Sequence, residues 1–225
     1  MRRRAAKDAL FEALAGAARA LASGRRAEIV DVLSQGERSV EEIAREVGQS
    51  LANTSHHLRT LARAGLVSTR RNGTRIHYRL AGDRVAELWS ALRDVSVAQD
   101  PEIDSLAEAY LGDRGALRSV DRTELAALVE QGRVVVIDVR PAAEYAAGHI
   151  AGARSVPPDE VGRRLEELPE DAEVVAYYRG PYCVYADDAV RALIGAGRRA
   201  RRLEDGFPEW RRAGLPVAVG EGRWP

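Results

Sequence analysis

The single cysteine of the chain, Cys183, lies at the end of a short loop whose residue types could bind an anion or carry sulfur. Apolar residues from Val174 to Tyr177 form a strand pattern, and a helix pattern runs from Val184 to Ala196. Backbone N–H groups of a loop in this position, together with the positive end of the following helix, stabilise an oxyanion or a thiolate. The predicted anion-binding loop consists of Tyr178, Arg179, Gly180, Pro181, Tyr182 and Cys183.

The elements around this loop are predicted to form a parallel sheet covered by helices. A second unbroken apolar run, Val134–Asp138, is typical of a strand buried on both faces. Helix patterns at 141–147 and 207–213 and a strand pattern at 201–203 alternate with these runs. Such alternation indicates an α/β unit.

Two motifs of this second half are similar to those of rhodanese sulfurtransferases. They are DVRPAAEYAAGHIAGA at 138–153 and LEDGFPEW at 203–210, and the resemblance covers residues 119–219. It implies a rhodanese-like domain in which the first loop position is normally a cysteine that carries a persulfide. Here that position is Tyr178, and a phenol with a pKa near ~10 cannot form a persulfide. The resemblance also implies that four motif residues fix loops by hydrogen bonds and charge pairs, in preference to His149 acting as a general base: Asp138, Arg140, Glu144 and His149.

Cys183 allows two interpretations. At the junction of a loop and a helix its thiol could have a lowered pKa and react with polysulfide or oxidants. Alternatively, it is a small, inert apolar plug at the helix start. Sequence leaves both open.

The first half of the chain has the pattern of a winged helix-turn-helix, an α+β arrangement. Ser39 and Glu42 have capping-box spacing before a short helix at 40–47, and Ser50 can cap a second helix at 51–64. Two strand patterns then flank Asn72-Gly73, a dipeptide suited to a two-residue type I′ turn. The sequence therefore predicts a helix-turn-helix followed by a hairpin wing.

The charge of this region indicates a polyanionic partner. No acidic residue occurs between Val47 and Gly82, although six arginines do. A surface arginine run can merely be solvated, but with helix-turn-helix spacing we expect double-stranded DNA to bind, with the second helix in the major groove. The predicted DNA contacts are Ser50, Asn53, Thr54, Ser55, His56, Arg59, Arg70, Arg71 and Arg75.

Residues 10–97 resemble the ArsR-type winged-helix repressors, most closely in the run NTSHHLRTLARAGLV at 53–67. The resemblance implies a homodimer that uses the first helix and the helix after the wing. That later helix carries an apolar stripe, which could equally cover the domain's own core. The stripe consists of Val85, Leu88, Trp89, Leu92 and Val95.

Metal sensing, known in that family, is not expected here. Residues 39–44 have no cysteine pair, and the adjacent His56 and His57 point about 100° apart on a helix. We therefore expect neither a metal site nor a cofactor.

Composition favours two domains of opposite charge. Residues 1–100 contain 17 Lys and Arg against 12 Asp and Glu, net +5, and the remainder 17 against 22, net −5. We expect a winged-helix domain at 1–98, a linker at 99–118 and a rhodanese-like domain at 119–225. No apolar run approaches the ~20 residues of a membrane span, and a lone cysteine excludes an internal disulfide, so a cytoplasmic protein without a membrane partner is expected.

The expected function is therefore a homodimeric DNA-binding repressor whose rhodanese-like domain senses a sulfur species or another small anion. One alternative is a sulfurtransferase in which Cys183 carries sulfur, Arg179 stabilises the anionic donor and the winged helix only localises the activity. A second alternative is a catalytically silent rhodanese-like interaction domain.

Overall fold

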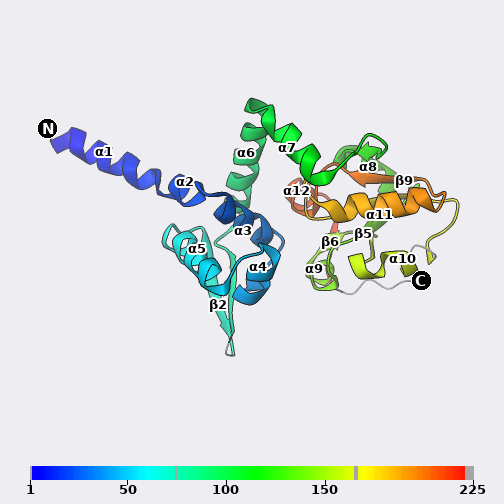
Figure 1. The fold of residues 1–225 in the computed structure, drawn as a ribbon, viewed down its shortest axis with the longest axis horizontal. Coiled ribbons are helices and arrows are strands. Elements are labelled where there is room, and N and C mark those ends of the chain that lie inside the picture. Colours follow the sequence, from blue (N-terminus) through cyan, green and yellow to red (C-terminus); the bar gives the residue numbers. More distant parts are fainter. Residues whose placement is uncertain (1, 74, 165–166, 221–225) are drawn as a thin grey trace. The chain divides into compact units, whose positions relative to one another are not determined.

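The computed structural model describes residues 2–73, 75–164 and 167–220, and it divides into two compact units, 1–100 and 101–225. Figure 1 shows the helices and strands of both units. Each unit has its own hydrophobic core, and each is described by itself below.

The first unit is a winged helix-turn-helix built on the core face of α3. Ile29, Val30 and Leu33 of this helix pack with Leu58 and Leu61 from the second helix of the motif. The fold predicted from the sequence is thus confirmed for this half. Its elements are α1 (Arg2–Leu14), α2 (Gly16–Leu21), α3 (Gly24–Ser34), β1 (Arg38–Ser39), α4 (Val40–Glu46), α5 (Leu51–Arg63), β2 (Val67–Asn72), β3 (Arg75–Leu80) and α6 (Asp83–Gln99).

Side-chain caps set the boundaries of α4 and α5. The Ser39 hydroxyl accepts from the Glu42 N–H and the Glu42 carboxylate accepts from the Ser39 N–H, so the predicted capping box is present. Ser50 caps α5 by accepting from the Asn53 N–H. Gly65, with φ +71°, ends α5 in the left-handed conformation expected of it.

The wing differs from the prediction in its turn and in its number of strands. Asn72 pairs with Arg75, so Gly73 and Thr74 separate the strands, and Thr74 lies outside the described residues. Asn72 does not have the positive φ that a type I′ turn would require of it. In addition, β1 pairs antiparallel with β3, a strand too short to give a sequence pattern.

The second unit is a parallel sheet in the order β4-β9-β8-β5-β7. Alternate residues of β8 enter two cores: Val174 and Ala176 pack with α11, and Val175 and Tyr177 pack with α8 and α12. The α/β prediction is therefore confirmed. The elements are α7 (Glu102–Leu111), β4 (Ser119–Val120), α8 (Arg122–Glu130), β5 (Val134–Asp138), α9 (Ala142–Ala147), β6 (His149–Ile150), β7 (Arg154–Ser155), η1 (Pro158–Glu160), α10 (Val161–Arg164), β8 (Glu173–Tyr177), α11 (Val184–Gly195), β9 (Ala200–Leu203), α12 (Phe207–Arg212) and β10 (Val217–Ala218).

The segment predicted as a linker, 99–118, is instead mostly part of the second unit, which begins at residue 101. It contains the helix α7, and both Leu111 and Leu117 are buried. Leu117 belongs to the same core as Val174. Among the described residues, no helix is both long and apolar enough to cross a membrane.

Candidate anion-binding loop and nucleic-acid interface

The first residue of the candidate loop, Tyr178, has its side chain in the protein core. It directly follows β8, is only 4% exposed, and packs with Ile137 and Val139. Its ring lies 5.2 Å from the ring of Tyr185 on α11. The position at which a rhodanese carries its nucleophile is therefore filled by a buried aromatic side chain.

Arg179 is paired with a carboxylate of the neighbouring helix α9. Its Nη2 lies 2.5 Å from Glu144 Oε1, and its Nε lies 3.1 and 3.2 Å from the two Glu144 oxygens. Both side chains are nearly buried. Because this bidentate pair neutralises the guanidinium, the predicted role of Arg179 as a cation for an anionic donor is not supported by its geometry.

Cys183 is the N-cap residue of α11 and packs partly against the core. Burial raises the pKa of its thiol to about 12, whereas backbone hydrogen bonds from Tyr185 and Ala186 and the charge of Arg179 act in the opposite direction with smaller effect. Of the two interpretations of Cys183, the inert plug at the helix start agrees with this environment, because desolvation outweighs the helix start and the pKa is not lowered. The thiol is protonated at neutral pH.

What remains available for an anion is the loop backbone. Gly180 and Pro181 are partly exposed, and the Tyr182 side chain is exposed. The N–H groups of Gly180 and Cys183 donate to no acceptor among the described residues. The N–H groups of Tyr185 and Ala186 in the first turn of α11 interact with the Cys183 sulfur, so the N–H groups of Gly180 and Cys183 are the donors that this loop offers to an oxyanion.

Gly206, at the start of α12, fixes the shape of this loop. A Cβ at this position would lie 2.3 Å from the Arg179 carbonyl atoms and 2.4 Å from the Gly180 nitrogen. The Phe207 N–H also donates to the Tyr178 carbonyl over 3.1 Å. Only glycine permits this approach of the two backbones.

Arg114 ties the loop to the segment that precedes β4. Its Nε lies 2.5 Å from Asp187 Oδ2 on α11, and its Nη1 donates to the Pro181 carbonyl over 3.0 Å. Asp187 is fully buried. Arg114 was not predicted as a site residue, because it lies in the segment expected to be a linker and a basic residue beside a helical pattern gives no further signal.

The four motif residues expected to fix loops do so. Asp138 and Arg140 form a fully buried ion pair with 2.6 Å between Oδ2 and Nη2. The Tyr177 hydroxyl donates to Asp138 and accepts from the Ile150 N–H. His149 is buried and stacks on a neighbouring tyrosine ring, so a general-base role has no support here.

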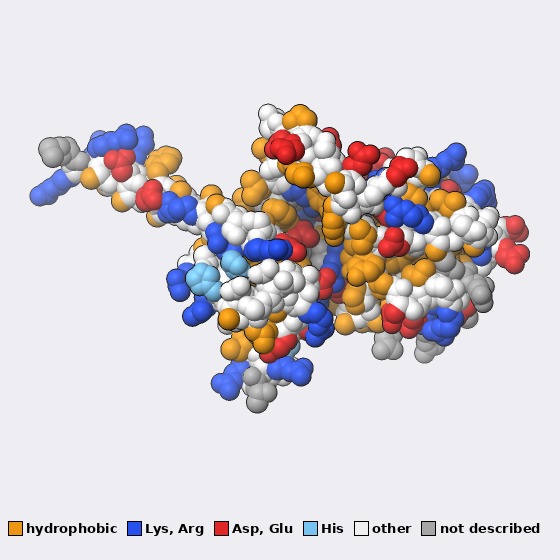
Figure 2. All heavy atoms as spheres, in the orientation of Figure 1, with side chains coloured by type: hydrophobic (Ala, Val, Ile, Leu, Met, Phe, Trp, Pro, Cys, Tyr) orange, Lys and Arg blue, Asp and Glu red, His pale blue; other side chains and the backbone are white. Residues whose placement is uncertain are grey.

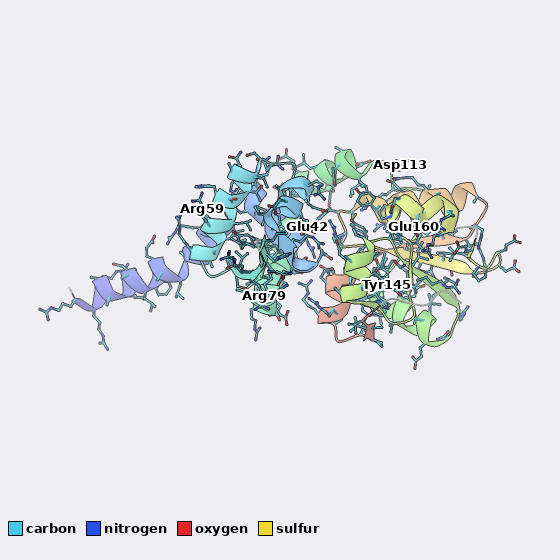
Figure 3. The ribbon with its side chains drawn as sticks, turned by 90° about the horizontal axis from the view of Figure 1, so that it is seen from below. Glu42, Arg59, Arg79, Asp113, Tyr145 and Glu160 are labelled. Atoms are coloured by element: carbon cyan, nitrogen blue, oxygen red, sulfur yellow. The ribbon has the colours of Figure 1, made fainter. Side chains whose placement is uncertain are left out.

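Most of the α5 side chains that are predicted to contact DNA are exposed. The side chains of Asn53, His56 and Arg59 are exposed, and that of Ser55 is half-buried. Arg59 can be located on α5 in Figure 3. Thr54, in contrast, is 0% exposed and faces the core, so the prediction that it contacts DNA is corrected. Ser50 has its hydroxyl engaged in the helix cap.

Three arginines of the wing differ in their surroundings. Arg70 makes a bidentate pair with Glu37, and this hydrogen bonding lowers the pKa of that carboxyl below its ordinary value. The Arg71 Nε donates to the Gly73 carbonyl. Arg75 is exposed and has no side-chain partner among the described residues. Figure 2 shows basic side chains on both sides of the hairpin tip.

Of the two adjacent histidines of α5, His56 is exposed and His57 is half-buried. Their rings are 5.9 Å apart, and burial lowers the pKa of His57. In the described ranges, no group of three or more His, Cys, Asp or Glu side chains is placed to hold an ion.

The apolar stripe of α6 divides between two environments. Val85 and Trp89 pack on the unit's own core, and the Trp89 Nε1 donates to Asp31. Leu88, Leu92 and Val95 are exposed. The helix α1 also exposes apolar side chains and buries none; they are Leu10, Phe11 and Leu14.

These features define a winged-helix regulator that carries a rhodanese-like unit without a cysteine at the first loop position. The family model of bacterial regulatory proteins of the arsR family matches residues 23–69, and that of the rhodanese-like domain matches residues 121–213. The HTH-type transcriptional regulator Rv0324 of Mycobacterium tuberculosis is 47% identical over 215 residues, which are 95% of this chain and 94% of that protein. The chain therefore belongs to the ArsR family of DNA-binding transcriptional regulators, with a rhodanese-like domain after its winged helix.

Each half also has relatives of its own. A sulfurtransferase of Allochromatium vinosum is 35% identical over 95 residues, 42% of this chain and 88% of that protein. The solution structure of the homodimeric winged helix-turn-helix domain of Mb0332 from Mycobacterium bovis is 45% identical, with a TM-score of 0.40 over 41% of this chain and 86% of that one.

Proposed function

We propose that this regulator is a homodimeric repressor of double-stranded operator DNA, and that its rhodanese-like unit senses a small anion or sulfur species without catalysing sulfur transfer. The observation that carries the sensing proposal is the loop from Tyr178 to Cys183. Two of its backbone N–H groups donate to no acceptor among the described residues, whereas its first side chain is buried. A ligand would be held by backbone hydrogen bonds and by the positive end of α11.

The side chains of the loop favour reversible binding over transfer. Tyr178 is buried, Arg179 is paired with Glu144, and the Cys183 thiol is protonated at neutral pH. Sulfur transfer needs a thiolate nucleophile, which this environment disfavours. A sulfurtransferase is thus the less supported alternative.

Arg114 offers a route by which the loop can affect DNA binding. Its guanidinium links the Pro181 carbonyl to the segment after α7, and the chain between Gln99 and Glu102 joins α7 directly to α6. An anion that shifts the loop would change the Pro181 contact. Because α6 and α7 follow one another along the chain, we expect a shift of the Arg114 segment to change the equilibrium position of these two helices.

The homodimer is supported by apolar side chains that the first unit leaves uncovered. Leu88, Leu92 and Val95 are exposed on α6 although their neighbours Val85 and Trp89 pack inward. Apolar surface of this kind on two long helices is typical of an interface. We assign it to a second copy of the chain, because recognition of a two-fold operator requires two winged helices.

The proposal is tested by binding of the full chain to DNA upstream of its own gene. We expect a specific complex whose affinity falls when thiosulfate or polysulfide is added, with chloride at equal ionic strength as the control. If the affinity for DNA responds equally to all these salts, the sensing proposal is wrong and the rhodanese-like unit is a silent domain.

Arg75→Ala should weaken binding to operator and non-operator DNA alike. The loss of one phosphate contact should lower the salt-dependence slope of log Kd by about one. Arg84→Ala, which also removes an exposed arginine but from α6, is the matched control. A slope identical in the two variants would contradict the placement of the wing on DNA.

Arg114→Lys should leave DNA affinity unchanged without an anion and abolish the response to it. Lysine keeps a positive charge for Asp187 but lacks the fork that also reaches Pro181. Arg191→Lys is the control, because Arg191 also ties α11 to this segment, through the Leu111 and Asp113 carbonyls, without contacting the loop. If both variants respond like the unmodified protein, the coupling path is wrong.

A further inference from the structure

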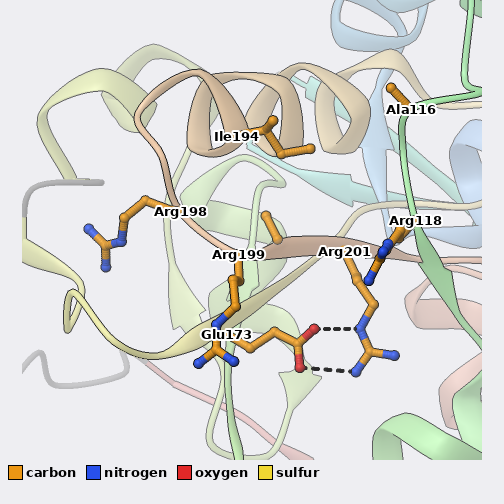
Figure 4. Close-up of a pocket in the computed structure, with 8 residues that line it drawn as sticks. Ala116, Arg118, Glu173, Ile194, Arg198, Arg199 and Arg201 are labelled. Atoms are coloured by element: carbon orange, nitrogen blue, oxygen red, sulfur yellow. Dashed lines mark hydrogen bonds and ion pairs between the residues drawn. The ribbon is translucent and has the colours of Figure 1, made fainter.

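A pocket lies at the end of the strands opposite to the loop. The loop follows the carboxyl end of β8, whereas this pocket is formed at the amino ends of β8 and β9. Its volume is about 210 Å³, and Figure 4 shows its arginine-rich wall. The pocket is lined by Ala116, Arg118, Glu173, Ile194, Arg198, Arg199, Ala200 and Arg201.

The charge of this pocket is opposite to that of the unit that contains it. Four arginines and one glutamate line it, whereas residues 101–225 contain 17 basic and 22 acidic side chains. The arginines come from two separate segments, because Arg118 precedes β4 and the others lie at the start of β9. The composition of this acidic unit therefore does not explain why four arginines lie at one pocket.

Only part of this positive charge is neutralised by carboxylates. Arg201 is paired with Glu173 at 2.9 Å and with Glu124 at 2.6 Å. Arg199, however, donates to the uncharged carbonyl of Asp171 over 2.6 Å. The Arg118 side chain has no ion pair or hydrogen bond within the described ranges. Two guanidinium groups thus keep their full charge at the pocket.

A purely structural role explains these residues only in part. Basic residues just after a helix offset the partial negative charge of its last carbonyls, and this accounts for arginines that follow α11. It does not account for Arg118, which reaches the pocket from another element. Arg118 and Arg199 thus bring two guanidinium groups without a carboxylate partner to one pocket, an arrangement that a bound anion would stabilise.

We propose that this pocket binds the phosphate or sulfate group of a small molecule that is free in solution. Guanidinium groups match the oxygens of such groups in charge and geometry. The volume is below the roughly 300–1,000 Å³ of pockets for drug-sized ligands, so one oxyanion group with a small substituent fits best. The exposed Ile194 side chain supplies an apolar surface for that substituent.

The test is a calorimetric titration of the full chain with inorganic phosphate, sulfate and pyrophosphate. Arg118→Ala combined with Arg199→Ala should raise Kd at least about tenfold, which corresponds to about 1.4 kcal/mol. Arg133→Ala combined with Arg211→Ala changes the net charge equally at exposed positions outside the pocket and should leave Kd unchanged. Equal Kd values for the two double variants would overturn the proposal.

Backbone amide NMR shifts separate this pocket from the anion-binding loop. We expect phosphate to shift the amides of Ala116 and Ala200, whether or not the loop also binds an anion. Shifts confined to Gly180 and its neighbours would assign the anion to the loop and overturn the pocket. If no free anion binds but the Arg118 and Arg199 variant lowers the salt-dependence slope of DNA affinity, the pocket holds DNA phosphate and the small-molecule proposal is wrong.

Discussion

Asp138→Ala should lower the free energy of unfolding of the rhodanese-like unit by about 3–5 kcal/mol. The substitution leaves Arg140, which is fully buried, without its carboxylate. It also removes the acceptor of the Arg140 N–H and of the Tyr177 hydroxyl. Three buried donors lose their partner at once, so the cost should exceed that of an ordinary surface pair.

Urea unfolding followed by tryptophan fluorescence measures this cost, because Trp210 is buried in the same unit. Asp188→Ala is the control: it breaks an exposed pair with Arg191 and should cost less than about 1 kcal/mol. Joint replacement of Asp138 by Leu and Arg140 by Met removes the unpaired guanidinium and should recover part of the loss, although the Tyr177 hydroxyl still lacks its acceptor. A cost for Asp138→Ala no larger than that of the control would contradict the network.

Cys183 should react with iodoacetamide about 3,000-fold more slowly than an unstructured thiol at neutral pH. Its pKa of about 12 lowers the thiolate fraction by about this factor relative to an ordinary cysteine near 8.5. The rate should rise about tenfold per pH unit below the pKa while the protein stays folded. Intact-mass measurement follows the reaction without ambiguity, because the chain has one cysteine.

Unfolding in urea should restore an ordinary rate and serves as the internal control. The sign of the linked stability follows from the raised pKa: the neutral thiol is favoured in the fold, so its contribution is present below about pH 8.5 and is lost as the pH rises towards 12. A native rate close to that of a free thiol, or thiosulfate-to-cyanide turnover lost in Cys183→Ser, would instead support the sulfurtransferase.

Local signals in the sequence were sufficient for the longer helices and strands, because caps and periodicity act over a few residues, but not for short strands such as β1. The Ser39 and Glu42 capping box and the left-handed Gly65 occur as predicted. The buried face of α5 was also legible: Thr54, Leu58 and Leu61 follow the i, i+4, i+7 spacing of a core face. Thr54 should on that ground have been assigned to the core.

Properties that depend on tertiary packing could not be predicted in this way. The pKa of Cys183 reflects how deeply the core covers it, which the position at a helix start does not reveal. The pairing of Arg179 with Glu144 joins residues 35 apart in the chain, and that of Arg114 with Asp187 joins residues 73 apart. Sequence identified the loop, but the contacts decide which of its groups remain available.

The contacts of Arg114 also determine how such sensors can be recombined. Consider a chimera in which rhodanese-like units are exchanged at residue 119, where the family resemblance begins. Arg114 and Leu117 would then stay with the winged-helix half and would not move with the unit they contact. A unit grafted from this protein would then lack Arg114, which pairs with its buried Asp187, and Leu117, which belongs to its core. A graft at the boundary between 100 and 101 transfers both, so the transferable module is longer than the motif that identifies it.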